Sequence, residues 1–264
     1  MSNQHTVLDE AGLAMAATPD NAAARLRFYE RLADTEMFLL LERESDGDSV
    51  EPLMLPQDDG PVVLVFDREA RLADFVGKPS AYAAMSGRLV VQMLRGQGVG
   101  LGVNLGTPAS EVLLPATAVD WLAETLEHRP QETEERPAEL EAPGNVPEAL
   151  LVGLDTKLAA AAGLAPMVYL AAVTYESGRK THLLAFVDAV DGAEGALATA
   201  VGEVLTFSGV EAGELDVAFF AASDPMAARL ARVGLRFDLP DAPKPEITEI
   251  APPGMDPDQP PILK

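Results

Sequence analysis

The chain has 264 residues, contains no cysteine and carries a formal net charge of -23. A surface this acidic repels phosphate backbones and anionic lipid, which argues against nucleic-acid and membrane partners. The lack of cysteine excludes disulfides, thiolate nucleophiles and cysteine metal sites. The N-terminus lacks a secretory signal pattern, and no apolar run approaches the roughly 20 residues of a membrane helix. We therefore expect a soluble, cytoplasmic protein.

The first predicted domain, residues 1–127, combines helices with short strands. Asp20 is expected to cap a helix whose apolar stripe repeats at spacings of three and four. The continuous apolar runs 37–41 and 62–66 predict strands buried on both faces, and Asp67 is expected to cap the helix after the second run. Further helices are predicted over residues 86–95 and 119–126.

Between these two helices, the segment GQGVGLGVNLG alternates glycine with apolar residues. A phosphate loop needs a lysine, and none occurs between Lys78 and Lys157. The spacing also lacks the G-x-G-x-x-G dinucleotide pattern. We expect instead a strand with Val99, Leu101, Val103 and Leu105 on one face, and the four residues Gly98, Gly100, Gly102 and Asn104 on the other.

Three glycines on one strand face cost stability, on the order of 0.5 to 1 kcal/mol each. Either a neighbouring helix or backbone packs closely there, or the bare face is the floor of a shallow groove for a ligand or partner peptide. Asn104 is the polar anchor in both alternatives.

Residues 128–146 are acidic, contain prolines and have almost no apolar anchor, so they are predicted to be a linker. A second domain, residues 147–240, shows the order helix, strand, strand, helix, strand, helix, strand. Its first two strands form a hairpin with Ser177-Gly178 at the bend. Asp191 and Glu194 resemble a capping box, and Asp224-Pro225 begins a short helix. Residues 241–264 are predicted to be a disordered proline-rich tail. The predicted fold class is α+β, in two domains that each have a small mixed or antiparallel sheet packed by helices.

Residues typical of catalysis are sparse. The histidines, at positions 5, 128 and 182, lack a second histidine at metal-ligand spacing, so no metal site is predicted. Ser86 and Ser208 fit helix caps or turns better than nucleophiles. Paired carboxylates cannot be chosen from 42 acidic residues without geometry. No catalytic residue and no cofactor are assigned.

The order of several segments resembles the SseB-like family, named for enhanced serine sensitivity. FLLLE, PVVLVFDREARLADF, GVGLGVNLG and VLLP resemble its N-terminal domain. HLLAFVD, LTFSGVEAGELDVAFF and DPMAARLARVGLRFDLP resemble its C-terminal domain. The resemblance implies a two-domain α+β cytoplasmic protein with no established reaction and no catalytic residues to transfer.

Three functions are therefore compared. The first is a non-enzymatic interaction or regulatory protein, with a protein partner or self-association. The second is a small-molecule sensor, with an amino acid as one candidate ligand. The third is an enzyme that uses carboxylates. Two acidic side chains converging in a concave apolar pocket would favour the third.

Overall fold

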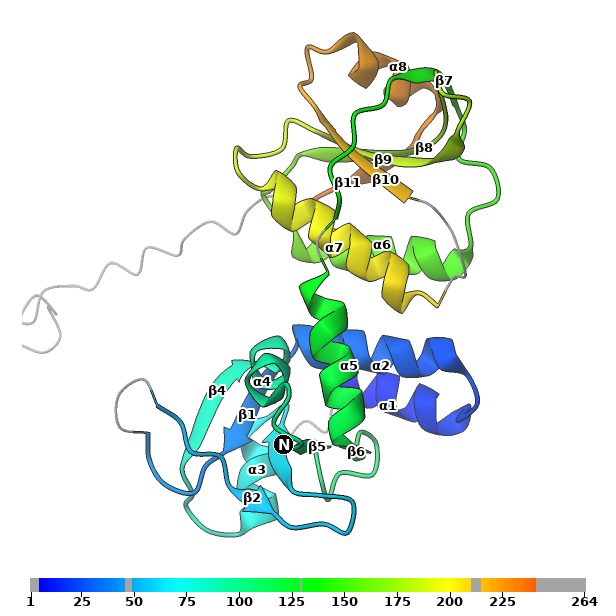
Figure 1. Cartoon of the computed structure of the whole chain (residues 1–264). Coiled ribbons are helices and arrows are strands. Elements are labelled where there is room, and N and C mark those ends of the chain that lie inside the picture. Colours follow the sequence, from blue (N-terminus) through cyan, green and yellow to red (C-terminus); the bar gives the residue numbers. More distant parts are fainter. Residues whose placement is uncertain (1–4, 46–48, 129, 210–214, 241–264) are drawn as a thin grey trace, which may run out of the picture.

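The computed structural model describes residues 5–45, 49–128, 130–209 and 215–240. The chain folds into two parts, each with its own sheet and helices (Figure 1). We call the part before residue 129 the N-terminal domain and the part after it the C-terminal domain. The predicted α+β class is confirmed. The predicted tail, residues 241–264, lies outside the described residues.

The N-terminal domain has a six-stranded mixed sheet in the order β4-β1-β3-β5-β6, with β2 paired to β3. Strands β3 and β5 are parallel and the other pairs are antiparallel. Its elements are α1 (Val7–Ala17), α2 (Ala22–Asp34), β1 (Glu36–Leu40), β2 (Met54–Leu55), β3 (Val62–Phe66), α3 (Glu69–Val76), β4 (Tyr82–Ser86), α4 (Gly87–Leu94), β5 (Gly100–Val103), β6 (Val112–Leu114) and α5 (Ala116–Glu127).

Both faces of this sheet are covered, as the continuous apolar runs predict. In β3, Val63 and Val65 join the core formed with α1, α2, α4 and α5. The alternate residues Val62, Leu64 and Phe66 belong to a smaller cluster under α3. All five residues of β3 are buried because helices lie on both sides.

The C-terminal domain has a five-stranded sheet in the order β10-β9-β8-β11, with β7 also paired to β8. Helices α6 and α7 cover one face of this sheet and α8 packs on the other. Its elements are β7 (Pro137–Glu141), α6 (Glu148–Ala160), β8 (Met167–Tyr175), β9 (Lys180–Val187), α7 (Glu194–Phe207), β10 (Leu215–Phe220), α8 (Pro225–Val233) and β11 (Leu235–Asp238). The predicted hairpin and the Asp224-capped helix are confirmed.

Part of the predicted linker is structured. Residues 137–141 form β7, which pairs with the end of β8, and Leu140 packs against the core beneath α8. Composition alone predicted no order here because an edge strand needs few apolar residues when its backbone is paired to a long neighbour. Helix α1 and strand β4 were also missing from the prediction.

Three predicted helix caps are wrong. Asn21, and not Asp20, caps α2 through its side-chain oxygen. Asp67 does not cap α3, because its carboxylate pairs with Arg71 one turn further on. Helix α7 begins after Ala193 without a side-chain cap, so Asp191 forms no capping box.

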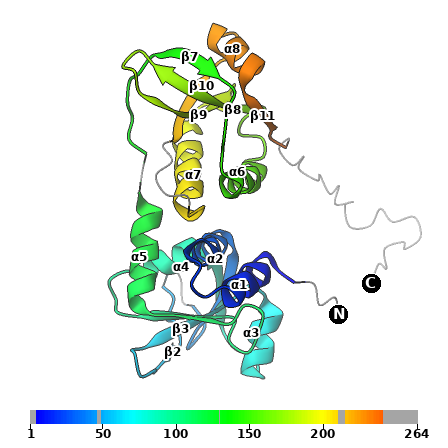
Figure 2. The ribbon, with the colours of Figure 1, turned by 90° about the vertical axis from the view of Figure 1, so that its right-hand side faces the viewer.

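The two domains meet through helices (Figure 2). Helices α6 and α7 lie between the C-terminal sheet and the α1–α2 pair, and α2 contacts α7. Phe207, the last residue of α7, is buried in the core of the N-terminal domain. Gly209 follows it so close to α2 that an added Cβ would lie 2.8 Å from the Ala23 Cβ atom. The domains are therefore docked by direct packing.

Candidate functional site

The structure places the four predicted groove residues in different surroundings. Only Gly100 and Gly102 lie within β5, while Gly98 is in a turn with φ 68°. An added Cβ at Gly102 would lie 2.6 Å from Leu64, and one at Gly100 would lie 2.6 Å from the Leu114 carbonyl oxygen. These contacts favour the close-packing alternative. Gly100 does border a cavity of about 290 Å³, so the groove stays a prediction.

Asn104 is buried and acts as a structural anchor. With φ 48°, it turns the chain so that Leu105 packs on the α3 side of the sheet and not, as predicted, on the face of Leu101. Its side-chain oxygen accepts a hydrogen bond from the Asp67 backbone N–H at 2.9 Å. Its amide nitrogen donates to the Ser110 hydroxyl at 2.8 Å. The amide thereby joins the ends of the parallel strands β3 and β5.

Ser110 continues this network into helix α1. Its hydroxyl donates to Asp9 at 2.6 Å, and Arg71 donates to both oxygens of the same carboxylate, at 2.9 and 2.5 Å. Burial would raise the pKa of Asp9, but the hydrogen bonds from Arg71 and Ser110 outweigh it and hold the pKa well below its usual range. The carboxylate has several donors within the protein, which is typical of a structural ion pair.

A second set of charges joins the domains, and we call it the interdomain ion cluster: Asp34, Arg88, Lys157 and Glu203. Arg88 donates to both oxygens of Glu203, at 2.7 and 2.9 Å, and Lys157 binds Asp34 at 2.5 Å and Glu203 at 3.0 Å. Burial would raise the pKa of Glu203, but Arg88 and Lys157 lower it below its usual range. Two positive and two negative groups balance within the cluster.

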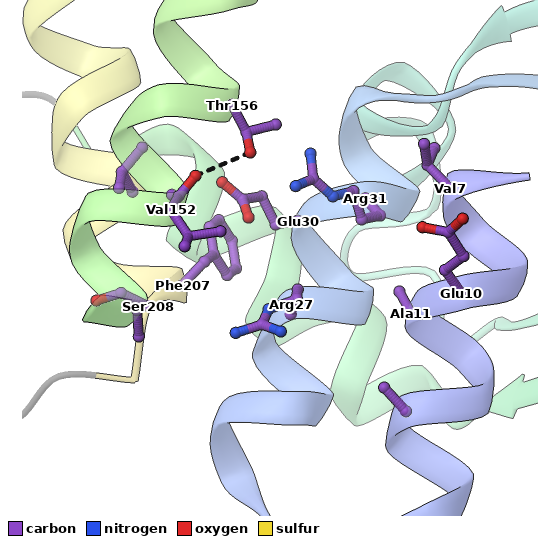
Figure 3. Close-up of a pocket in the computed structure, with 14 residues that line it drawn as sticks. Val7, Glu10, Ala11, Arg27, Glu30, Arg31, Val152, Thr156, Phe207 and Ser208 are labelled. Atoms are coloured by element: carbon purple, nitrogen blue, oxygen red, sulfur yellow. Dashed lines mark hydrogen bonds between the residues drawn. The ribbon is translucent and has the colours of Figure 1, made fainter. Parts of the chain in front are cut away.

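Beside this cluster is a cavity of about 400 Å³ between the domains, which we call the interdomain pocket (Figure 3). Helices α1 and α2 form one wall, and α6 and α7 form the other. The lining combines apolar side chains, among them Val7, Val152 and Phe207, with charged ones. A volume of this size suits a small organic molecule, since ligand pockets usually measure about 300 to 1,000 Å³.

Glu30 is the unusual residue of this pocket. It is only 6% exposed. Among the described residues its carboxylate has neither a hydrogen-bond partner nor an ion pair, although Lys157 and Arg31 act on it at longer range. Burial raises the pKa of Glu30. Figure 3 shows its side chain directed between α2 and α6, toward Val152 and Thr156. Its carboxylate oxygens still touch solvent, because none of the buried side-chain oxygens of the described residues lacks a hydrogen-bond partner. They open onto the cavity, where water or a ligand supplies their donors.

Two arginines of α2 also line the interdomain pocket. Arg27 and Arg31 are one helical turn apart and therefore lie on the same side of the helix. Within the part of the chain that the structure describes, neither guanidinium forms an ion pair. Glu10 of α1 completes the charged lining. In Figure 3 the carboxylates of Glu10 and Glu30 point to different parts of the cavity, on different sides of α2.

The other residues considered from the sequence have structural roles. Ser86 caps α4 by accepting from the Leu89 N–H, and the Ser208 hydroxyl donates to the Leu205 carbonyl oxygen. The His182 Nε2 atom lies 2.7 Å from the Pro143 carbonyl oxygen. Across residues 5–45, 49–128, 130–209 and 215–240, no group of three metal-binding side chains comes together.

Sequence reasoning did not find the interdomain pocket, although one local signal exists. Glu30 follows Leu26 by four residues and thus continues the apolar side of α2 with a carboxylate. A charged residue in line with an apolar stripe indicates burial against a partner. The partner itself, α6 with α7, lies more than a hundred residues further along the chain.

Fold and site together define a two-domain α+β protein with a charged pocket where its domains meet. Residues 8–121 match the SseB protein N-terminal domain, so the predicted SseB-like family is confirmed over this part of the chain. The resemblance of the second half to the family's C-terminal domain stays a prediction. No curated protein and no solved structure matches the chain significantly. No helix among the described residues is long and apolar enough to span a membrane.

Proposed function

We propose that the chain is a non-enzymatic, cytoplasmic regulatory protein that binds a small molecule in the interdomain pocket. The observation that carries this proposal is Glu30, a largely buried residue whose carboxylate opens onto the cavity and has no hydrogen-bond donor among the described residues. The contrast with Asp9 and Glu203 supports it, because those buried carboxylates each have two or more donors. A ligand with a charged donor would replace water at this carboxylate, in a largely enclosed site where a charge-assisted hydrogen bond is stronger than in bulk water.

The position of the pocket explains how binding becomes regulation. Its walls belong to different domains, so a ligand that contacts both walls favours the docked arrangement over a separated one. A molecule that binds the docked form alone stabilises it by RT ln(1 + [L]/Kd), about 2.7 kcal/mol at one hundred times Kd. The surface offered to a protein partner then depends on ligand concentration.

The divergent directions of Glu10 and Glu30 count against the carboxylate-enzyme alternative. Acid–base catalysis requires both groups within reach of one reacting centre. Binding requires only that each carboxylate meets a complementary group, and the pocket offers room for that.

The test of this proposal is a thermal-shift screen with short acids, amines, zwitterions, sugars and nucleosides. At least one class should raise the melting temperature of the wild-type protein. Val152→Trp should abolish the shift, because the larger side chain fills the cavity. Val190→Trp is the matched control, since Val152 and Val190 are both 51% exposed and Val190 does not line the pocket. A screen without a shift that depends on Val152 would refute the proposal.

A second candidate function is self-association through strand β4, which lies at the edge of the N-terminal sheet. The Leu41 N–H donates to Ala81, and the Gly87 N–H donates to Thr35. The alternation of an antiparallel ladder therefore turns the backbone groups of Tyr82 and Ala84 away from β1. Edge strands of monomers usually carry charged residues that block pairing. This strand, YAAMS, carries none.

Antiparallel pairing of β4 with a second copy would join two sheets across a twofold axis at Ala84. Sedimentation velocity should then show a dimer at micromolar concentration, and Ala84→Lys should return the protein to a monomer. The control Ala73→Lys alters an exposed position of α3 instead. A wild-type protein that stays monomeric up to high concentration contradicts this candidate and leaves the pocket proposal untouched.

A further inference from the structure

Resting on the proposed function, we propose that the ligand of the interdomain pocket is a small zwitterion, with a protonated amine and a carboxylate on a short apolar frame. The charged lining consists of two cations and two anions: Arg27, Arg31, Glu10 and Glu30. A zwitterion adds no net charge to this balanced set. A simple anion would bring no donor to Glu30, and a simple cation would face two arginines.

Glu30 is the residue that receives the amine. Lys157, the cation that acts on Glu30 most strongly, is already bound to Asp34 and Glu203. A protonated amine brings three N–H donors and a positive charge to the buried carboxylate. Glu30 lines the cavity, so a ligand inside it can make this contact.

Arg27 and Arg31 receive the carboxylate. Guanidinium groups bind carboxylates through paired, charge-assisted hydrogen bonds, and these two have no competing ion pair among the described residues. Figure 3 shows the Arg31 side chain between the α1 wall and Glu30, with Arg27 lower on the same helix beneath Phe207. The two charged ends of the ligand would thus both contact α2.

The remaining lining sets the size and character of the frame. Val7 and Ala11 of α1 and Phe207 of α7 offer apolar surface from both domains. A cavity of about 400 Å³ lies at the small end of the usual range for ligand pockets, which suits a compact molecule and excludes a dinucleotide. The acidic surface of the whole chain further disfavours polyanions.

The experiment is calorimetric titration of the full chain with the standard amino acids, followed by matched analogues of the tightest binder. Leucine, for example, is compared with isocaproate, which lacks the amine, and with isoamylamine, which lacks the carboxylate. Each analogue should bind at least tenfold more weakly, because it loses one charge-assisted contact of about 1.4 kcal/mol or more.

Substitutions in the pocket test which residue binds each end of the ligand. Glu30→Gln should weaken binding of the zwitterion roughly tenfold or more and leave the affinity for isocaproate unchanged. Arg27→Ala should weaken binding of both compounds. The controls are Glu36→Gln and Arg25→Ala, at exposed positions that do not line the pocket. Glu30→Gln should also raise the melting temperature of the ligand-free protein at neutral pH. Because the pKa of Glu30 is raised on folding, its ionised form destabilises the fold there.

The outcomes are distinguishable. If isocaproate or isoamylamine binds as tightly as the zwitterion, in a manner that requires Val152, the ligand class is wrong and the pocket proposal survives. If Glu30→Gln binds the zwitterion like wild type, the assignment of the amine to Glu30 is wrong. If no compound of any class binds, the pocket proposal fails together with this inference.

Discussion

Phe207→Ala should separate the two domains without unfolding either. Phe207 ends α7 of the C-terminal domain, yet its ring is 2% exposed and belongs to the core of the N-terminal domain. Burial of an aromatic side chain removes about 150 Å² or more from water. At about 25 cal/mol per Å², this contributes about 4 kcal/mol, within the range measured for Phe→Ala changes in cores.

Most of this loss falls on domain docking, because the separated N-terminal domain keeps its own helices over its sheet. Small-angle scattering should show a larger radius of gyration for Phe207→Ala. Limited proteolysis should cleave faster within residues 130–136, which connect α5 to β7. Far-UV circular dichroism should stay unchanged, since the secondary structure of each domain survives.

Phe219→Ala is the control of equal size. Phe219 stacks on Phe186, with ring centroids 5.4 Å apart, inside the C-terminal domain. Its loss should lower the free energy of unfolding of that domain and leave the scattering curve unchanged. The reasoning would be refuted if Phe207→Ala kept the wild-type radius of gyration, or if both variants expanded the molecule equally.

Other substitutions test the buried ion pairs and the close packing of β5. Asp9→Asn should destabilise the protein by about 3 kcal/mol or more at pH 7, because it breaks a buried ion pair. Since the pKa of Asp9 is lowered on folding, its contribution should disappear as the pH falls below 3.8, so urea midpoints of wild type and variant should converge in acid. Arg88→Met should leave Glu203 with Lys157 as its main partner and raise the pKa of Glu203, which carbon-detected NMR titration would reveal; an unchanged pKa would contradict the ion-pair geometry. Gly102→Val should lower the melting temperature by several degrees, because even a Cβ lies 2.6 Å from Leu64, and a neutral result would show that this face is open.

The local sequence predicted elements well where burial follows one periodicity. The α5 positions Val119, Leu122, Ala123 and Leu126 are buried as their spacing predicts. The alternation of Gly100, Leu101, Gly102 and Val103 appears as a strand with one face in the main core. These patterns are readable because a residue's neighbours in sequence determine which way its side chain points.

The same pattern predicted a glycine strand that is too long at both ends. Gly98 and Asn104 continue the alternation in sequence but have positive φ angles, so the strand begins after Gly98 and ends before Asn104. What stops it at Asn104 is a pair of hydrogen bonds, to Asp67 and to Ser110. Nothing in a period-two pattern encodes such contacts.

The sequence by itself determined the α+β class, the core strands and the acidic surface, because composition and short-range periodicity are local properties. Only the tertiary structure decided which charges are paired and which are free. Arg88 and Glu203 are 115 residues apart in sequence. Glu30 differs from Asp9 and Glu203 because, where the two domains meet, no donor among the described residues forms a hydrogen bond with its carboxylate. Pairing across such distances depends on how helices dock, which no single stretch of sequence specifies.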